Sequence, residues 1–180
     1  MVALITGSSH TGKTLLAQRL LERLHWPYLS IDHLKMGLIR NGLCTLTPES
    51  PDFDLTSFLW PVVREMVKTA IENQQNLIVE GCYIPFDCLE QFAPSYRAQI
   101  RFLCLIFSRR YLENHFDLVI HHANVIEKRL VGNICDCETL LKENVFNLAQ
   151  CQALGLPYHL IDQVYDVEFL DLGFETLHQA

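Results

Sequence analysis

The chain has 180 residues, of which 49% are apolar, and carries a formal net charge of −7. This length and composition predict a single domain, residues 1–180, with a substantial core, and they exclude an intrinsically disordered chain. The acidic balance argues against broad nucleic-acid binding, which depends on basic patches that neutralise phosphates.

The beginning of the chain and its cysteines predict a cytoplasmic protein with no membrane contact. The apolar run Val2–Ile5 is too short for the hydrophobic region of a signal peptide, and no apolar run is long enough to span a membrane. The cysteines are odd in number, seven, and several lie in apolar runs, so we expect free thiols in a reducing compartment. Cys135 and Cys137 could bind a metal, but no second pair lies at zinc-site spacing, which makes a metal site the less favoured interpretation.

The first half of the chain alternates short buried strands with helices. We predict strands over Met1–Thr6, Tyr28–Ile31 and Leu77–Val79, and helices over Lys13–Leu24, Leu34–Arg40 and Leu55–Asn73. The last of these helices is expected to bury an apolar stripe made of Val62, Met66, Val67, Ala70 and Ile71. Residues 41–54 form a loop rich in Gly, Pro, Thr and acids.

The second half continues the alternation. We predict strands over Arg101–Phe107 and Tyr158–Ile161, helices over residues 109–130 and Thr139–Leu154, a break over 131–138 and a short last helix after Asp162. Buried strands that alternate with helices are typical of a parallel sheet covered on both faces. The fold class is therefore α/β, with five strands in one sheet.

The most specific motif follows the first strand and leads into the first helix. Its members are Gly7, Ser8, Ser9, His10, Thr11, Gly12, Lys13 and Thr14, which match G-x-x-x-x-G-K-[ST] at every fixed position. Glycines let the backbone curl so that its N–H groups point at a phosphate, and the helix N-terminus adds partial positive charge. Lys13 would reach the β- and γ-phosphates of ATP and stabilise the moving group, while the Thr14 hydroxyl would bind Mg²⁺.

Two acids end neighbouring strands, at the edge where open α/β sheets bind ligands. Asp32 follows the second strand and could accept the proton of an attacking hydroxyl or hold Mg²⁺ through water; the alternative is a helix N-cap. Glu80 ends the third strand and could be the second Mg²⁺ partner beside Thr14; the alternative is a solvated acid.

Basic residues follow the fourth strand. Arg109 and Arg110 could stabilise the charge that phosphoryl transfer spreads over oxygens, and Lys128-Arg129 could join them from a helical lid over residues 109–138. A solvated helix face explains the same charges equally well. More weakly, Lys35 and Arg40 could hold an anionic acceptor.

Together, the segments GSSHTGKT, SIDHLKMG and LIVEGCYIP, and the arginines after FLCLIFS, resemble the small P-loop kinases. That group includes adenylate and other monophosphate kinases, shikimate and gluconate kinases, chloramphenicol phosphotransferase, zeta-toxin kinases and proteins called 2-phosphoglycerate kinase-like. The resemblance implies a three-layer αβα P-loop NTPase fold with strand order 2-3-1-4-5, a mobile lid, ATP as donor, and Asp32 as base or magnesium partner. Cys82-Tyr83-Ile84-Pro85 departs from the Phe-Pro-Arg of monophosphate kinases, because the arginine is missing.

We therefore predict an ATP- and Mg²⁺-dependent kinase for a small hydroxylated or phosphorylated acceptor. Residues 41–54 and 82–94 are expected to line the acceptor pocket. Two alternatives remain: a nucleoside monophosphate kinase with a divergent acceptor loop, and a regulatory ATPase with no small-molecule acceptor. The acceptor's identity and the oligomeric state stay open.

Overall fold

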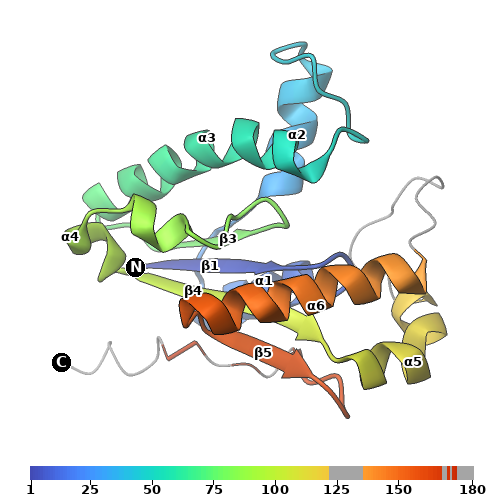
Figure 1. Cartoon of the computed structure of the whole chain (residues 1–180). Coiled ribbons are helices and arrows are strands. Elements are labelled where there is room, and N and C mark those ends of the chain that lie inside the picture. The colour runs from blue at the N-terminus through green and yellow to red at the C-terminus, as the bar shows by residue number, and fades with distance from the viewer. Residues whose placement is uncertain (122–135, 168–169, 171, 174–180) are drawn as a thin grey trace.

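The fold is built on one parallel sheet of five strands in the order β2-β3-β1-β4-β5 (Figure 1). This computed structural model describes residues 1–121, 136–167, 170 and 172–173. The strands are β1 (Val2–Gly7), β2 (Tyr28–Ser30), β3 (Leu77–Glu80), β4 (Ile100–Phe107) and β5 (Tyr158–Ile161). The predicted α/β class and strand order are confirmed.

Helices connect the strands. They are α1 (Lys13–Leu24), α2 (Ile31–Arg40), α3 (Asp52–Glu72), the 3-10 helix η1 (Cys88–Gln91), α4 (Pro94–Arg97), α5 (Arg109–His121) and α6 (Cys137–Leu154). α1 has the predicted bounds, whereas α2 and α3 each begin three residues earlier than predicted. The sequence analysis missed η1 and α4, which are only one turn long. Beyond His121, the predicted helix and break up to residue 135 lie outside the described residues.

The two faces of the sheet pack against different helices. Ala3 and Ile5 of β1 belong to a core with α1 and α5, while Val2 and Leu4 belong to a core with α3. This alternation follows from the two-residue period of a strand, and both sets are fully buried. A continuous apolar strand is thus buried on both sides, which is why its sequence shows no polar alternation.

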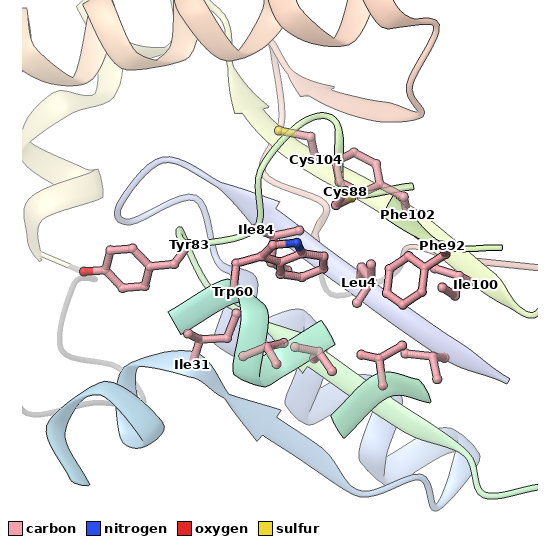
Figure 2. Packing of buried hydrophobic residues seen from close by; sticks show 14 of the residues in the cluster. Leu4, Ile31, Trp60, Tyr83, Ile84, Cys88, Phe92, Ile100, Phe102 and Cys104 are labelled. Carbon is pink, nitrogen blue, oxygen red and sulfur yellow. The ribbon is translucent and has the colours of Figure 1, made fainter. Parts of the chain in front are cut away.

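The core on the α3 side is rich in aromatic residues (Figure 2). Trp60 of α3 and Phe92 meet edge to face with ring centroids 6.1 Å apart, and Leu4 and Ile84 belong to the same cluster. Tyr83 lies at the edge of the cluster in Figure 2, with its hydroxyl directed away from the other labelled side chains. The cluster thus holds the segment after β3 in place.

One prediction about α3 is wrong. Val62 and Met66 are 41% and 38% exposed, so they do not belong to the buried stripe. The buried face consists of Leu55, Leu59, Trp60, Val63, Val67, Ala70 and Ile71. The helix begins earlier than predicted and buries its Trp60, so the face turned to the sheet is rotated away from Val62 and Met66.

The remaining chain-wide expectations concern thiols and membranes. Six cysteines lie in the described part of the chain, and all six are free thiols, as predicted. Cys137 begins α6, whereas Cys135 lies outside the described residues. Within the described ranges, no helix is both long and apolar enough to cross a membrane.

Candidate phosphate and acceptor site

All five strands are parallel, so their carboxyl ends meet at one edge of the sheet. In Figure 1 the strands point toward α2, α5 and the first turn of α6. The register brings Ser30 of β2 opposite Glu80 of β3, and Ile5 of β1 opposite the same Glu80. Residues that directly follow these strands are therefore neighbours in space although they are far apart in sequence.

The loop after β1 has the backbone that a phosphate cradle requires. Gly7, His10 and Gly12 have φ values of 140°, 67° and 93°, all in the region that side chains disfavour. A Cβ on Gly7 would lie 2.3 Å from the carbonyl oxygen of Leu105. The loop can therefore take this path beside β4 only because residue 7 is glycine.

Lys13 starts α1 and is buried beneath the loop, with 6% of its surface exposed. Its Nζ donates to the carbonyl of Ser8 at 2.8 Å, and Thr11 Oγ1 donates to the same carbonyl at 2.9 Å. Burial lowers the pKa of the Lys13 ammonium, but neighbouring Cys82, Glu80 and Asp32 raise it, and the net shift is upward. Lys13 is thus a buried cation beside the loop, and it could form an ion pair with a phosphate.

Thr14 and Glu80 form the pair that the sequence analysis proposed for Mg²⁺. Thr14 Oγ1 donates to Glu80 Oε2 at 3.3 Å, although the two residues are 66 positions apart. Glu80 is 1% exposed, which excludes the alternative of a solvated acid. A hydroxyl and a carboxylate are the oxygen donors that Mg²⁺ prefers, so this pair fits the ion by its chemistry.

Asp32 lies in the first turn of α2 and not at its N-cap, which is Ser30. Lys35 Nζ donates to Asp32 Oδ1 at 2.6 Å and to the Tyr83 hydroxyl at 2.8 Å. The N-cap interpretation of Asp32 is therefore wrong: its carboxylate forms an ion pair with a lysine whose side chain is 10% exposed. The sequence analysis had named Asp32 and Lys35 but gave no individual role to Tyr83.

The surroundings shift the pKa values of Lys35 and Tyr83. Burial lowers the pKa of Lys35, but its hydrogen bonds to Asp32 and Tyr83 raise it more, and the net shift is upward. Burial raises the pKa of the Tyr83 phenol, against the lowering effect of Lys35. At neutral pH, Lys35 is therefore a cation and Tyr83 a neutral phenol.

Helix α6 contributes side chains that the sequence analysis missed. Asn147 Nδ2 donates to Ser8 Oγ at 2.9 Å, 139 residues away in sequence. Asn144 is buried, accepts from the Phe107 N–H at 2.8 Å and thereby fastens α6 to the end of β4. The only signal in the sequence is that polar residues interrupt an otherwise apolar helix face.

Glu143 lies on the same helix and also reaches the phosphate loop. Burial and the carboxylate of Asp52 raise its pKa, while Lys13, the Ser8 hydroxyl and the Ser9 backbone lower it, and the net shift is upward. Glu143 thus interacts with Asp52 of α3 as well as with the phosphate loop. Carboxylates of α2, α3 and α6 therefore act electrostatically on this part of the site.

Among the described residues, the arginines proposed for the site are exposed to solvent. Arg109 has 64% of its side chain exposed and forms a 3.3 Å ion pair with Glu113 of its own helix. Arg110 is exposed beside it, and Arg40 is exposed in the last turn of α2. Lys128-Arg129 lies outside the described residues. The structure thus places Arg109 and Arg110 directly after β4 without a contact to the phosphate loop.

Known structures resemble this chain, although no curated sequence does. No protein-family model matches the chain, and no curated protein matches it. Solved structures do match. A gluconokinase from Sinorhizobium meliloti aligns with a TM-score of 0.51 and 13% identity, over 91% of this chain and 84% of the gluconokinase. A Chloroflexus aurantiacus protein that has been assigned as a kinase aligns with a TM-score of 0.54 and 20% identity, over 95% and 88% of the two chains.

This chain has the fold of the P-loop kinases. The resemblance inferred from the sequence is confirmed at the level of the fold, including the strand order that it implied. Open α/β sheets bind ligands at the carboxyl ends of their strands. The loop of residues 7–14, the Thr14–Glu80 pair and the Asp32–Lys35–Tyr83 cluster all lie along this edge.

Proposed function

We propose that this protein transfers the γ-phosphoryl group of ATP to a small-molecule acceptor, with Mg²⁺ as cofactor. One observation carries the proposal: a buried Lys13 lies under a loop of positive φ, and the adjacent Thr14 contacts the strand-end acid Glu80. In P-loop sites, groups of these kinds bind the phosphates of a nucleoside triphosphate and polarise them. The shared fold supports the assignment and does not by itself establish it.

Each residue has a role in the proposed reaction. The loop N–H groups and Lys13 bind the phosphates, and Lys13 stays bound to the phosphoryl group as it moves. Thr14 and Glu80 hold Mg²⁺, which when bound neutralises charge on the phosphate oxygens. Asp32 orients the acceptor hydroxyl and accepts its proton. Arg109 and Arg110, which are exposed at the start of α5, would stabilise charge on the moving phosphoryl group.

The contacts of Asp32 leave one of its carboxylate oxygens open to an acceptor. Lys35 Nζ donates to Asp32 Oδ1 at 2.6 Å, so the ion pair occupies that oxygen. The second carboxylate oxygen, Oδ2, makes no hydrogen bond within the described residues and can receive a proton from an acceptor. The geometry therefore supports transfer to a hydroxyl better than it supports a regulatory ATPase.

The test measures ADP release with ATP and Mg²⁺ against nucleoside monophosphates, sugars, glycerate phosphates and antibiotics. Acceptor-stimulated turnover is expected, and Lys13→Ala should reduce it at least about 100-fold, the scale of losing one positioned transition-state donor. Lys142→Ala is the matched control, because Lys142 is 73% exposed and, among the described residues, forms an ion pair with Glu138 alone. The control should keep full turnover.

The outcomes separate the alternatives. Conversion of AMP or another monophosphate to its diphosphate would identify a monophosphate kinase. ATP binding that needs Lys13 but is followed by no transfer to any acceptor would point to the regulatory ATPase. Equal turnover of Lys13→Ala and Lys142→Ala would refute the proposal.

A further inference from the structure

We propose that the acceptor is an uncharged or cationic molecule with adjacent hydroxyl groups, and that it binds to the Asp32–Lys35–Tyr83 cluster. This inference rests on the proposed function, since it names the class of acceptor at the same site. It narrows the class of acceptor expected from the sequence, which included phosphorylated molecules and in which Lys35 was expected to bind an anion.

The first argument is the hydrogen-bonding capacity that the cluster leaves open. An ammonium has three N–H donors, and Lys35 spends two of them on Asp32 and Tyr83. Tyr83 accepts from Lys35, and its own O–H makes no hydrogen bond within the described residues. Asp32 Oδ2 is open as an acceptor in the same part of the structure. The cluster thus offers two donors and one acceptor within one small area.

This combination matches a pair of hydroxyl groups. A hydroxyl donates one hydrogen bond and accepts up to two, so one acceptor hydroxyl can donate to Asp32 and accept from Lys35. A neighbouring hydroxyl can accept from Tyr83. A carboxylate or phosphate of an acceptor can only accept, and it would face the Asp32 carboxylate with no proton to donate.

The second argument is charge. The Lys35 ammonium forms an ion pair with Asp32 at 2.6 Å. The pair has no net charge and therefore does not attract an anion. Asp52 and Glu143 stand close enough to influence each other, and Asp32 acts on Lys13 across the site. Within the described residues, four carboxylates lie near Lys13 and the phosphate loop, those of Asp32, Asp52, Glu80 and Glu143, and they outnumber the two ammonium groups of Lys13 and Lys35. An anionic acceptor would be repelled, whereas a neutral or amino-bearing one would not.

The third argument is rigidity. Tyr83 is 6% exposed and is anchored in the α3-side core, while its hydroxyl points out of that core (Figure 2). The Lys35 ammonium lies 4.9 Å from the centroid of the Tyr83 ring and also donates a hydrogen bond to the Tyr83 hydroxyl. Groups held by packing lose little freedom when a ligand binds, which is what a selective site needs.

The test compares compounds that differ in charge and share hydroxyl groups. The uncharged and cationic probes are D-glucose, myo-inositol, D-glucosamine and kanamycin; the anionic ones are D-gluconate, D-glucuronate, glucose 6-phosphate and 3-phosphoglycerate. Binding to the full chain with ADP and Mg²⁺ is measured by ligand-observed NMR and calorimetry, and transfer by ADP release with ATP. We expect members of the first set to bind and to accept the phosphoryl group. Their Kd should be at least about tenfold lower, and their rate of ADP release at least about tenfold higher, than those of their anionic counterparts.

Two variants connect the preference to the named residues. Tyr83→Phe keeps the packing and removes one hydrogen bond, so it should raise the Kd of the bound probe roughly 3- to 10-fold with ATP affinity unchanged. Asp52→Lys should reduce the preference over anions, while Glu72→Lys, the same charge change at the other end of α3, should not. Thermal unfolding checks that each variant is folded.

Three results would overturn the inference: stronger binding of the anionic set, no binding of either set, or full affinity in Tyr83→Phe. These results differ from a failure of the proposed function. Transfer to gluconate in preference to D-glucose would leave the kinase standing and refute this inference. Binding of a sugar without any ATP-dependent transfer would refute the kinase and leave only the binding preference of the cluster.

Discussion

Replacing Gly7 with alanine tests the reasoning about the phosphate loop most directly. The residue has φ 140°, a conformation that costs an L-residue about 1–3 kcal/mol. The new Cβ would also lie 2.3 Å from the Leu105 carbonyl oxygen, a backbone atom that cannot rotate away. Gly7 pairs with Leu105 in the β1–β4 register, so relief of the contact has to open the end of the ladder. One or two lost hydrogen bonds add about 1–2 kcal/mol, for a total of about 2–5 kcal/mol.

Gly37→Ala is the matched control, because it adds the same methyl group at a position with the opposite expectation. Gly37 lies inside α2, and a Cβ there would meet no atom within 4 Å. Alanine in a helix interior is about 0.5–1 kcal/mol more favourable than glycine. We therefore expect Gly37→Ala to stabilise the fold.

Urea unfolding followed by circular dichroism measures both variants. With a slope of about 2 kcal/mol per molar urea, Gly7→Ala should lower the midpoint by roughly 1–2.5 M, and Gly37→Ala should raise it slightly. ATP binding by Gly7→Ala should be lost even in buffer where the variant is folded. Midpoints that shift by the same amount in both variants would show that the close approach of Gly7 to β4 is not real.

Three further predictions follow from the packing and the protonation of the site. Leu59→Ala should lower the free energy of unfolding by about 2–5 kcal/mol, while Met66→Ala should stay within about 0.5 kcal/mol; equal losses would restore the stripe expected from sequence. Asn144→Ala should cost about 1–3 kcal/mol, because the Phe107 N–H loses its acceptor; an unchanged urea midpoint would contradict this role of the side chain. The folded-state pKa of Glu143 is raised above 4.5, so the native protein loses stability as pH rises from about 4.5 through that pKa. The side chain in Glu143→Gln does not titrate, so the free energy of unfolding of this variant minus that of the unsubstituted protein should be lowest below pH 4 and rise across this window. A difference that falls with rising pH in urea titrations would refute the assignment.

Much of the fold could be predicted because local signals and burial agree. The helix over Lys13–Leu24 has a clear amphipathic period and ends before Trp26-Pro27, and its bounds are confirmed. Strands buried on both faces are continuous apolar runs, which are easy to find. The start of α3 was missed by three residues because Asp52 and Asp54 look like loop residues, although acids favour the first turn of a helix.

The site could be predicted only in part, for a different reason. The loop of residues 7–14 is contiguous, so its pattern is visible in the sequence. The contact of Asn147 with Ser8 joins residues 139 positions apart, and the polar interruption of the apolar helix face does not indicate which residue Asn147 contacts. Lys35 was interpreted as a binding group for an anion, whereas its contact with Tyr83 depends on how α2 packs against the segment after β3. The roles assigned to Lys13, Asp32, Glu80, Arg109 and Arg110 stay predictions until the variants are measured.

Helix α2 begins at Ile31 with no linker after β2, and this has a consequence for protein engineering. Asp32 and Lys35 lie in the first half of a helix that continues directly from the sheet, whereas residues 41–51, which follow α2, are mostly exposed. Exposed loops tolerate exchange and insertion at small cost in stability. Libraries that vary the length and sequence of this loop can therefore search for new acceptors while the groups that we propose to contact the reacting hydroxyl stay in place.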